Sequence, residues 1–253
     1  MKILLTGGGS GGHFYPLIAV ARDLKKIAEE ERVFDLRLIY MSDDPYDRDL
    51  LLRENIEFKK VTSGKLRRYF SLLNFVDIFK VFLGSSKAFW SMLFDMPDVV
   101  FSKGGYASFP AVFVAFLLRI PTIIHESDAV PGLVNRNMGK FAKRIAVSFP
   151  EASKFFPENK TAYIGNPVRR ELIGGTLEEA QSVFHFEENV PLIFVLGGSQ
   201  GAQKINATLV DALLELLPEY QVIHQCGKNN FKAVYARSSV VLEKSEFKKR
   251  YHL

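Results

Sequence analysis

A chain of 253 residues with 47% hydrophobic and 24% charged side chains has the composition of a soluble globular protein with one large or two ordinary domains. The net charge of +5 favours anionic partners such as nucleotides or phospholipids, but the scattered lysines and arginines form no nucleic-acid recognition module. The single cysteine, Cys226, excludes an internal disulfide. Because the chain begins with a strand pattern and lacks a run of about 18 uncharged apolar residues, we expect neither a signal peptide nor a membrane-spanning helix.

The first predicted strand, residues 2–5, leads through a glycine-rich loop into a predicted helix over residues 16–30. The loop has the sequence Gly7-Gly8-Gly9-Ser10-Gly11-Gly12-His13. Free backbone N–H groups where such a loop enters a helix bind anions, and the helix dipole adds to the attraction. The His13 side chain titrates near neutral pH. The loop therefore predicts a phosphate site with a proton acceptor beside it, which suits group transfer.

Two other functions of this loop are disfavoured. The spacing Gly7-x-Gly9-x-x-Gly12 also matches the dinucleotide-binding pattern, which needs an acidic residue about 20 residues further along the chain. The candidates at the end of the second predicted strand, Asp43 and Asp44, come about 30 residues after the loop. The loop does not match the phosphate-binding motif of ATPases either, because no Gly-Lys-Ser/Thr stands at its end.

Apolar strand-like runs alternate with helical patterns along the rest of the chain. We predict strands over residues 36–40, 99–101, 122–125, 144–147, 192–196 and 220–224, and helices over residues 47–55, 108–118 and 202–216. This alternation is typical of a parallel sheet with helices on both faces, so we predict an α/β fold.

Two glycines and a tyrosine follow the predicted strand at 99–101. Gly104 and Gly105 allow the backbone to approach a ligand, and Tyr106 can stack on that ligand or form a hydrogen bond with it. The alternative is an ordinary turn from a strand to a helix.

Three polar side chains, His125, Glu126 and Asp128, stand at the carboxyl end of the predicted strand at 122–125. Ligands of open α/β sheets bind at this end of the strands. One histidine and two carboxylates make a poor zinc site, and the alternative is a capping cluster for the next helix.

The segment 66–94 is unusually rich in aromatic and aliphatic side chains. Basic residues are interleaved with them at Lys65, Arg67, Arg68, Lys80 and Lys87. Charges interrupt the segment too often for it to span a bilayer, but it can lie on an anionic membrane surface. The alternative is a pair of core helices.

A second strand, glycine loop and helix begin about 190 residues after the first, with the loop at residues 197–202. Two such units predict two Rossmann-like domains that face each other across a cleft, residues 1–164 and 191–253, with a linker over residues 165–190. The second domain shows two strands, one clear helix and a charged tail. We therefore expect it to be incomplete and to expose apolar strand surface around Ile193, Val195 and Val222.

Taken together, these motifs resemble the MurG family, the N-acetylglucosaminyltransferases that make lipid II for peptidoglycan. They follow the family's order across nearly the whole chain. The matching stretches are residues 8–13 with Pro16, 104–106, 125–126 with 131–133 and Asn135, 165–169, 197–202 with Asn206, and 224–227.

The resemblance implies a GT-B fold whose N-terminal domain binds the lipid-linked acceptor and whose C-terminal domain binds UDP-N-acetylglucosamine. The implied reaction transfers N-acetylglucosamine, with inversion, to the C4 hydroxyl of undecaprenyl-diphosphate-linked N-acetylmuramoyl pentapeptide (lipid I). It takes place at the cytoplasmic face of the bacterial cell membrane, on a peripheral protein. No metal or other cofactor is implied, since a helix dipole and loop amides stabilise the departing UDP. The alternatives are a GT-B transferase for another lipid acceptor and an inactive acceptor-binding fragment.

The resemblance also implies roles for single residues, with His13 as the general base. The implied donor-binding residues are Ser10, Gly11, Gly12, Asp128, Arg169, Ser199 and Gln200. The implied acceptor-binding residues are Gly104, Gly105, Tyr106, Glu126 and Asn135. The chain departs from the family pattern at Asp128, where members usually carry Asn. It also ends before the family's downstream glutamate, so we expect a half-built donor site that binds UDP-N-acetylglucosamine weakly.

Overall fold

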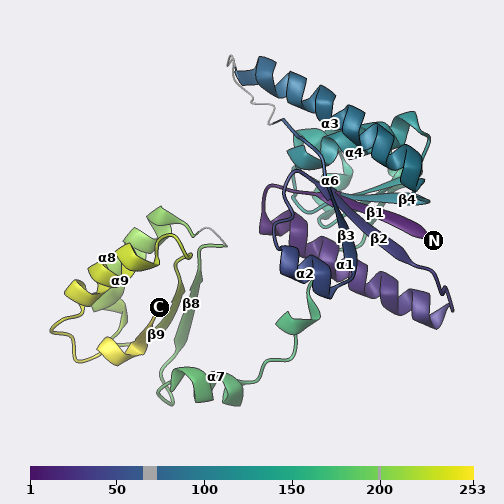
Figure 1. Cartoon of the computed structure of the whole chain (residues 1–253). Coiled ribbons are helices and arrows are strands. Elements are labelled where there is room, and N and C mark those ends of the chain that lie inside the picture. Colours follow the sequence, from purple (N-terminus) through teal and green to yellow (C-terminus); the bar gives the residue numbers. More distant parts are fainter. Residues whose placement is uncertain (65–72, 199–200) are drawn as a thin grey trace. The chain divides into compact units, whose positions relative to one another are not determined.

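The computed structural model of the chain describes residues 1–64, 73–198 and 201–253. The chain divides after Ile173 into two compact units (Figure 1), an N-terminal unit of residues 1–173 and a C-terminal unit of residues 174–253. The division falls inside the segment that the sequence marks as a linker. Part of that segment forms helix α7 (Leu177–Phe184), whose Phe184 ring contacts His252 of the C-terminal unit.

The N-terminal unit is built on a seven-stranded sheet in the order β3-β2-β1-β4-β5-β6-β7, with every neighbouring pair parallel. The strands are β1 (Lys2–Gly7), β2 (Arg37–Ser42), β3 (Ile56–Lys60), β4 (Val99–Gly104), β5 (Thr122–Glu126), β6 (Arg144–Val147) and β7 (Thr161–Tyr163). The strand order reverses between β1 and β4. At such a point the loops at the carboxyl ends of two adjacent strands diverge to opposite faces, which opens a crevice for a ligand.

Helices cover both faces of this sheet (Figure 1). They are α1 (Gly11–Glu30), α2 (Arg48–Arg53), α3 (Leu73–Asp95), α4 (Phe109–Leu117), α5 (Leu133–Met138) and α6 (Pro150–Ser153), with short 3₁₀ turns at Tyr106–Ser108, Glu158–Lys160 and Arg170–Leu172. Because successive strand residues point to opposite faces, Leu5 packs on Phe14 of α1, whereas Leu4 packs on the other face with Met92 of α3.

Helix α1 begins at Gly11, five residues before the predicted start at residue 16. Gly11 and Gly12, which the sequence assigns to the loop, form the first helical turn together with His13. Pro16 therefore lies in the second turn, inside the helix. His13 is the third residue of α1, close to the positive end of the helix dipole.

The described part of segment 66–94 is one continuous helix, α3, so the alternative of two helices is wrong for residues 73–95. Residues 65–72 lie outside the described residues. Gly84 does not break the helix but lets it approach the chain after β3: a Cβ on Gly84 would lie 1.7 Å from the Thr62 carbonyl oxygen. Several exposed side chains of α3 are apolar, among them Phe82 (65%) and Phe94 (80%).

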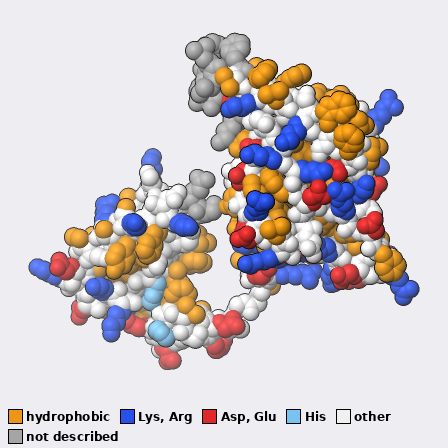
Figure 2. All heavy atoms as spheres, viewed as in Figure 1, with side chains coloured by type: hydrophobic (Ala, Val, Ile, Leu, Met, Phe, Trp, Pro, Cys, Tyr) orange, Lys and Arg blue, Asp and Glu red, His pale blue; other side chains and the backbone are white. Residues whose placement is uncertain are grey.

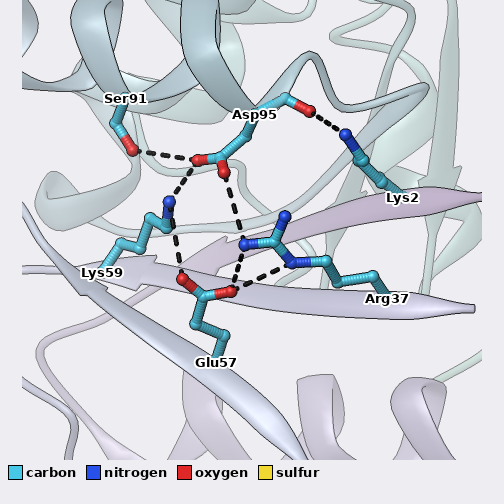
Figure 3. Close-up of polar contacts among 6 residues, drawn as sticks. All are labelled: Lys2, Arg37, Glu57, Lys59, Ser91 and Asp95. Carbon is cyan, nitrogen blue, oxygen red and sulfur yellow. Dashed lines mark hydrogen bonds and ion pairs between the residues drawn. The ribbon is translucent and has the colours of Figure 1, made fainter.

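The carboxyl end of α3 is fastened to the sheet by a network of charges around Asp95 (Figure 3). The buried Asp95 carboxylate pairs with Lys59 of β3 and, at 3.4 Å, with Arg37 of β2. Arg37 also pairs with Glu57 at 2.5 Å, and the Asp95 carbonyl oxygen accepts a hydrogen bond from Lys2 Nζ at 2.8 Å. These contacts fix the end of α3 while its outer face stays uncovered.

The C-terminal unit has a three-stranded parallel sheet in the order β10-β9-β8, formed by β8 (Leu192–Leu196), β9 (Gln221–Gln225) and β10 (Tyr251–His252). Its further helices are α8 (Gln203–Leu216), α9 (Phe231–Val241) and a 3₁₀ turn at Lys248–Arg250. The charged tail thus adds a short third strand. In the described residues of both units, no helix is long and apolar enough to cross a bilayer.

The exposed apolar strand surface predicted around Ile193, Val195 and Val222 exists on β8, but these three side chains do not form it. Val222 is completely buried, and Ile193 and Val195 pack against the same core. Because side chains alternate along β8, the opposite face presents Leu192, Phe194 and Leu196, which are 43%, 57% and 58% exposed.

Candidate functional site at the carboxyl ends of β1, β4 and β5

A cavity of about 380 Å³ opens at the carboxyl ends of β4 and β5 beside the first turn of α1. Its wall brings together six of the residues predicted from the sequence: His13, Gly105, Tyr106, Glu126, Asp128 and Asn135. Apolar side chains, including Val81, Phe109 and Leu133, form the rest of the wall. A cavity with a mostly apolar wall and a few converging polar groups is the usual form of a small-molecule site.

Glycines allow the loops after β1 and β4 to touch. Gly105 has a φ of +81°, and a Cβ there would lie 2.6 Å from the Gly8 carbonyl oxygen and 3.4 Å from His13 Nε2. Gly9 has a φ of +89°, and its Cβ would lie 2.7 Å from the Tyr106 ring. Side chains at either position would push the two loops apart, so the close approach requires glycine.

His13 is held in place by a contact between its Nδ1 and Ser10 Oγ at 2.9 Å. The tautomer that donates from Nδ1 to Ser10 leaves an unprotonated Nε2 on the Gly105 side of the ring. Burial lowers the pKa of His13, and the charge of Lys103 lowers it further, against the opposing carboxylates of Asp128 and Glu126. The imidazole is therefore neutral near pH 7 and able to accept a proton.

Glu126 is buried and uses both of its carboxylate oxygens to order the loop that follows β5. Oε1 accepts the Asp128 N–H at 3.0 Å, and Oε2 accepts the Gly132 N–H at 3.2 Å and Asn135 Nδ2 at 3.0 Å. Charge-assisted bonds of this kind are stronger than neutral ones. The carboxylate thus fixes the backbone on which Asp128 and Asn135 stand.

Asn135 is buried and has one free acceptor. Its Nδ2 also donates to the His125 carbonyl oxygen at 3.2 Å, whereas its buried Oδ1 has no hydrogen-bond partner within the described ranges. Gly104, at a φ of +86°, makes room for this side chain, since a Cβ there would lie 2.5 Å from Asn135 Nδ2. The predicted acceptor residues Gly104 and Asn135 are therefore direct neighbours.

Tyr106 lies between the main cavity and a second cavity of about 190 Å³ on the other side of the glycine loop. Burial raises the pKa of the Tyr106 hydroxyl, and the nearby Asp43 carboxylate raises it further. The hydroxyl stays protonated near neutral pH, and a hydrogen bond with Asp43 favours this protonated form.

One buried residue next to this site, Lys103, was not predicted from the sequence. Lys103 is only 1% exposed, and its Nζ lies 2.7 Å from His125 Nδ1 and 3.4 Å from Asn166 Oδ1. Burial lowers the pKa of Lys103 to about 8. Burial together with the Lys103 charge lowers the pKa of His125 to about 4. The signal was a single charge at the end of an otherwise uncharged strand, Val99–Gly104.

Of the other predicted residues, Arg169, Gly11 and Gly12 lie at helix α1. Arg169 lies with its guanidinium 4.1 Å from the centre of the Tyr15 ring, which belongs to α1, so it approaches the helix that the glycine loop begins. Gly11 and Gly12 form the first turn of α1, where N–H groups have no partner within the helix. Ser199 and Gln200 lie outside the described residues. In the part of the chain that is described, no three His, Cys, Asp or Glu side chains are grouped as metal ligands.

Two parallel sheets, with a glycine loop and a histidine where the strand order of the first sheet reverses, define an α/β protein with a ligand site at the switch point of its first sheet. Residues 3–147 match the glycosyltransferase family 28 N-terminal domain, and residues 192–251 match the family 28 C-terminal domain. The chain therefore belongs to glycosyltransferase family 28.

Within this family the predicted resemblance to MurG is confirmed. A protein of Bacillus thuringiensis (strain Al Hakam) named UDP-N-acetylglucosamine–N-acetylmuramyl-(pentapeptide) pyrophosphoryl-undecaprenol N-acetylglucosamine transferase 3 is 43% identical over 229 residues, which are 90% of this chain and 63% of that protein. A protein of the same name, without the number, from Clostridium perfringens (strain 13 / Type A) is 40% identical, over 90% of this chain and 62% of its own length. The chain thus spans less than two thirds of the length of these relatives.

Solved structures agree with the α/β, GT-B fold predicted from the sequence. MurG from Acinetobacter baumannii matches with a TM-score of 0.65 at 25% identity, over 95% of this chain and 65% of that one. A UDP-GlcNAc 2-epimerase from Neisseria meningitidis matches with a TM-score of 0.63 at 16% identity, over 100% of this chain and 71% of that one, which shows a shared fold.

Proposed function

We propose that the protein acts in an inverting hexosyltransferase reaction that moves N-acetylglucosamine from UDP-N-acetylglucosamine to the C4 hydroxyl of lipid I, giving lipid II. One observation carries the proposal: a neutral histidine at a helix N-terminus, oriented by Ser10, stands in the wall of a cavity large enough for a sugar. The substrates named for the curated relatives at 40–43% identity supply the chemical class of donor and acceptor.

In this mechanism the residues of the N-terminal unit bind the acceptor and take its proton. His13 Nε2 accepts the C4 hydroxyl proton as the hydroxyl oxygen forms a bond to the anomeric carbon of N-acetylglucosamine. The bond from that carbon to UDP breaks on the opposite side, and UDP leaves with the electron pair. Attack opposite the leaving group accounts for inversion. Arg169, Ser199 and Gln200 are the proposed partners of the donor diphosphate, and no metal ion is part of the proposal.

The polar groups of the cavity are suited to a sugar hydroxyl or amide. Glu126 and Asn135 are polar groups of its wall, while Tyr106, Phe109 and Leu133 offer apolar surface to the faces of the ring. Asn135, held by Glu126, fixes the far wall of the cavity. We assign these residues to the acceptor.

A membrane surface is the proposed location of the lipid-linked acceptor. Hydrophobic side chains gather along α3 in Figure 2, among them Phe79, Phe82 and Trp90, which are each more than half exposed. Lys80 and Lys87 lie on the same helix and are exposed to solvent. An apolar helix face with basic residues beside it is suited to anionic headgroups, as on the cytoplasmic face of a bacterial membrane. The protein would then be peripheral, with residues 66–94 as its contact.

The experiment is a transfer assay with UDP-N-acetylglucosamine and a water-soluble lipid I analogue, comparing the wild type, His13→Ala and His185→Ala. His185 is an exposed histidine of the C-terminal unit and serves as the matched control. Loss of the base should lower turnover by roughly two to four orders of magnitude, with binding of the acceptor analogue largely kept.

The same assay separates the alternatives. Calorimetric binding of the lipid I analogue without any transfer would identify an acceptor-binding protein rather than an enzyme. Transfer to a different lipid, such as diacylglycerol, in preference to the analogue would identify another GT-B transferase. Equal turnover in His13→Ala and His185→Ala would remove His13 from the mechanism.

A further inference from the structure

A basic cavity of about 410 Å³ lies at the C-terminal end of α5, next to the candidate site. Its wall carries three cations, Arg136, Lys140 and Lys154, and no carboxylate. Asn137 of α5 lines both this basic cavity and the main cavity that His13 lines. The two cavities therefore meet at one residue, and the basic cavity is a separate recess beside the site already described.

The three cations of the basic cavity lack anionic partners. Within the described ranges, none of them takes part in an ion pair. A further cation comes close, because Lys160 Nζ donates to the Lys140 carbonyl oxygen at 3.2 Å. The carboxylates nearest in the sequence, Glu151 and Glu158, do not line the cavity. A recess walled by charges of one sign attracts a ligand of the opposite sign, so this cavity is suited to an anion.

The rest of the wall favours one kind of anion. Phe155, Phe156 and Pro157 give the basic cavity an apolar side. The Arg136 guanidinium lies 5.5 Å from the centre of the Phe155 ring, a contact that orients the guanidinium. A planar guanidinium binds a carboxylate through two parallel hydrogen bonds. Apolar surface beside the cations therefore suits the carboxylate end of a peptide better than a free phosphate ion.

The basic cavity lies within reach of the peptide of the proposed acceptor. In lipid I the pentapeptide is joined to the sugar through the lactyl group at C3, next to the C4 hydroxyl, and it ends in a free carboxylate. From Leu133 of the main cavity to Lys140 of the basic cavity the chain rises by about 10 Å, at about 1.5 Å per residue. An extended pentapeptide spans at most about 17 Å. A peptide on a sugar in the main cavity can therefore pass Asn137 and enter the basic cavity.

We propose that the basic cavity binds the terminal carboxylate of the acceptor's peptide through Arg136, Lys140 and Lys154, and that Asn137 contacts the peptide between the two cavities. This assignment rests on the proposed function, which supplies the identity of the acceptor. Binding of the peptide is nevertheless measurable whether or not the chain transfers the sugar.

The test compares two water-soluble lipid I analogues, one with the free terminal carboxylate and one with a terminal carboxamide. Their binding to the 253-residue chain is measured by calorimetry at low salt. Wild type should bind the carboxylate form about tenfold more tightly, because only that form carries the charge that the cations attract. The double variant Lys140→Gln and Lys154→Gln should bind both forms alike. Arg136→Gln, a second variant, should lose part of the preference.

A matched double variant removes two charges elsewhere on the same unit. Lys26→Gln and Lys143→Gln replaces two exposed lysines that do not line the basic cavity, so it should keep the wild-type preference. All the substituted side chains are exposed, and the variants should therefore fold as the wild type does. Inorganic phosphate, added at the concentration of the analogue, should displace little of the carboxylate form.

Equal binding of the two forms by wild type, or binding of neither, overturns the proposal. A preference that persists in the double variant of the basic cavity also overturns it, because the carboxylate is then bound elsewhere. If that variant does not fold, an unchanged preference in Arg136→Gln has the same meaning. Displacement of the carboxylate form by an equal concentration of phosphate would identify a phosphate site instead.

Failure of this site and failure of the proposed function give different results. Transfer by a wild type that shows no preference between the two analogues contradicts the peptide site and leaves the transfer reaction standing. A clear preference without any transfer contradicts the transfer reaction and leaves the peptide site standing.

Discussion

The two units bury polar side chains next to their sheets in different ways. In the C-terminal unit, His224 of β9 contacts Asn206 of α8 at 3.0 Å and Tyr251 of β10 at 2.8 Å, so a strand, a helix and the next strand are joined. In the N-terminal unit, the network of Lys103 and His125 joins two strands to a turn and lies beside a cavity of about 380 Å³.

The difference teaches that buried polarity alone does not mark a functional site. Both ring nitrogens of His224 have hydrogen-bond partners, so this network stabilises the C-terminal unit. The N-terminal network leaves an ammonium group without an anion and a neighbouring amide oxygen, Asn135 Oδ1, without a donor, within the described residues. Unsatisfied groups cost stability, so their presence at a cavity is the informative observation.

The largest effect expected on stability comes from Gly105→Ala. The added Cβ would clash with the Gly8 carbonyl oxygen at 2.6 Å and would strain a φ of +81°. We expect a loss of about 3 kcal/mol in the free energy of unfolding, and loss of acceptor-analogue binding. Gly174→Ala is the matched control, because Gly174 has a φ of +97° but no atom within 4 Å of its Cβ. Equal effects of the two variants would show that the contact between the loops does not matter.

Acid should destabilise the N-terminal unit through His125. Its pKa in the folded chain is about 4, below the ordinary 6.5. Between these two pH values, His125 is therefore protonated in the unfolded chain but not in the folded chain. The contribution of His125 to stability is therefore complete above pH 6.5 and is lost as the pH falls through 6.5 towards 4, by about 3 kcal/mol in total.

The single tryptophan, Trp90, lies in α3 and reports on this unit by fluorescence during urea unfolding. His125→Gln should flatten the pH dependence between 6.5 and 4. An equally steep dependence in that variant would assign the acid sensitivity to other groups.

Asp95→Ala compares a partly buried ion network with an exposed ion pair. Asp95 binds Lys59 and Arg37 with a side chain that is 8% exposed (Figure 3). Its loss should lower the free energy of unfolding, followed by Trp90 fluorescence, by about 2 kcal/mol. Asp211 of the C-terminal unit pairs with Arg237 at 2.5 Å with both side chains at least half exposed, so Asp211→Ala should cost less than about 0.5 kcal/mol. A cost for Asp211→Ala that matched that of Asp95→Ala would contradict this ranking.

The smallest effect concerns membrane contact. The double variant Phe82→Ser and Phe94→Ser should weaken binding to vesicles with anionic headgroups by about fivefold, measured by sedimentation. Phe194→Ser, at the exposed face of β8, should not. Added salt should weaken wild-type binding, because Lys80 and Lys87 contribute to it. If Phe194→Ser weakened vesicle binding as much as the double variant on α3 does, the binding would be unspecific adsorption.

The sequence predicted the buried strands well and the sheet edges poorly. Runs such as 122–125 are mostly apolar because the strand is buried, so composition reveals them. Strand β3 (Ile56–Lys60) carries three charges, and β7 has only three residues. Edge strands are half exposed, so their sequences resemble loops.

Within the site, single residues could be predicted but not their pairing. His125 stood out by its motif, but its contact with Lys103 depends on the register of β4 and β5, which sets Ser102 beside Ile124. The start of α1 was placed too late because glycine has a low helix propensity. The structure gives a reason for glycine in this first turn despite that propensity: a Cβ at Gly11 would lie 2.7 Å from the Tyr46 hydroxyl.

The position of β1 in the sheet has a consequence for the order in which the protein folds. Ile3 pairs with Leu38 on one side, but with Val99 on the other, 96 residues further along the chain (99 − 3). During synthesis the first strand therefore keeps an open edge until β4 has left the ribosome, long after β2 can pair with it. Contacts between distant parts of a chain form slowly, because closing a long loop costs entropy. The cavity needs Gly105 against Gly8, so it forms late in folding, and a nascent chain has no place for the proposed acceptor until then.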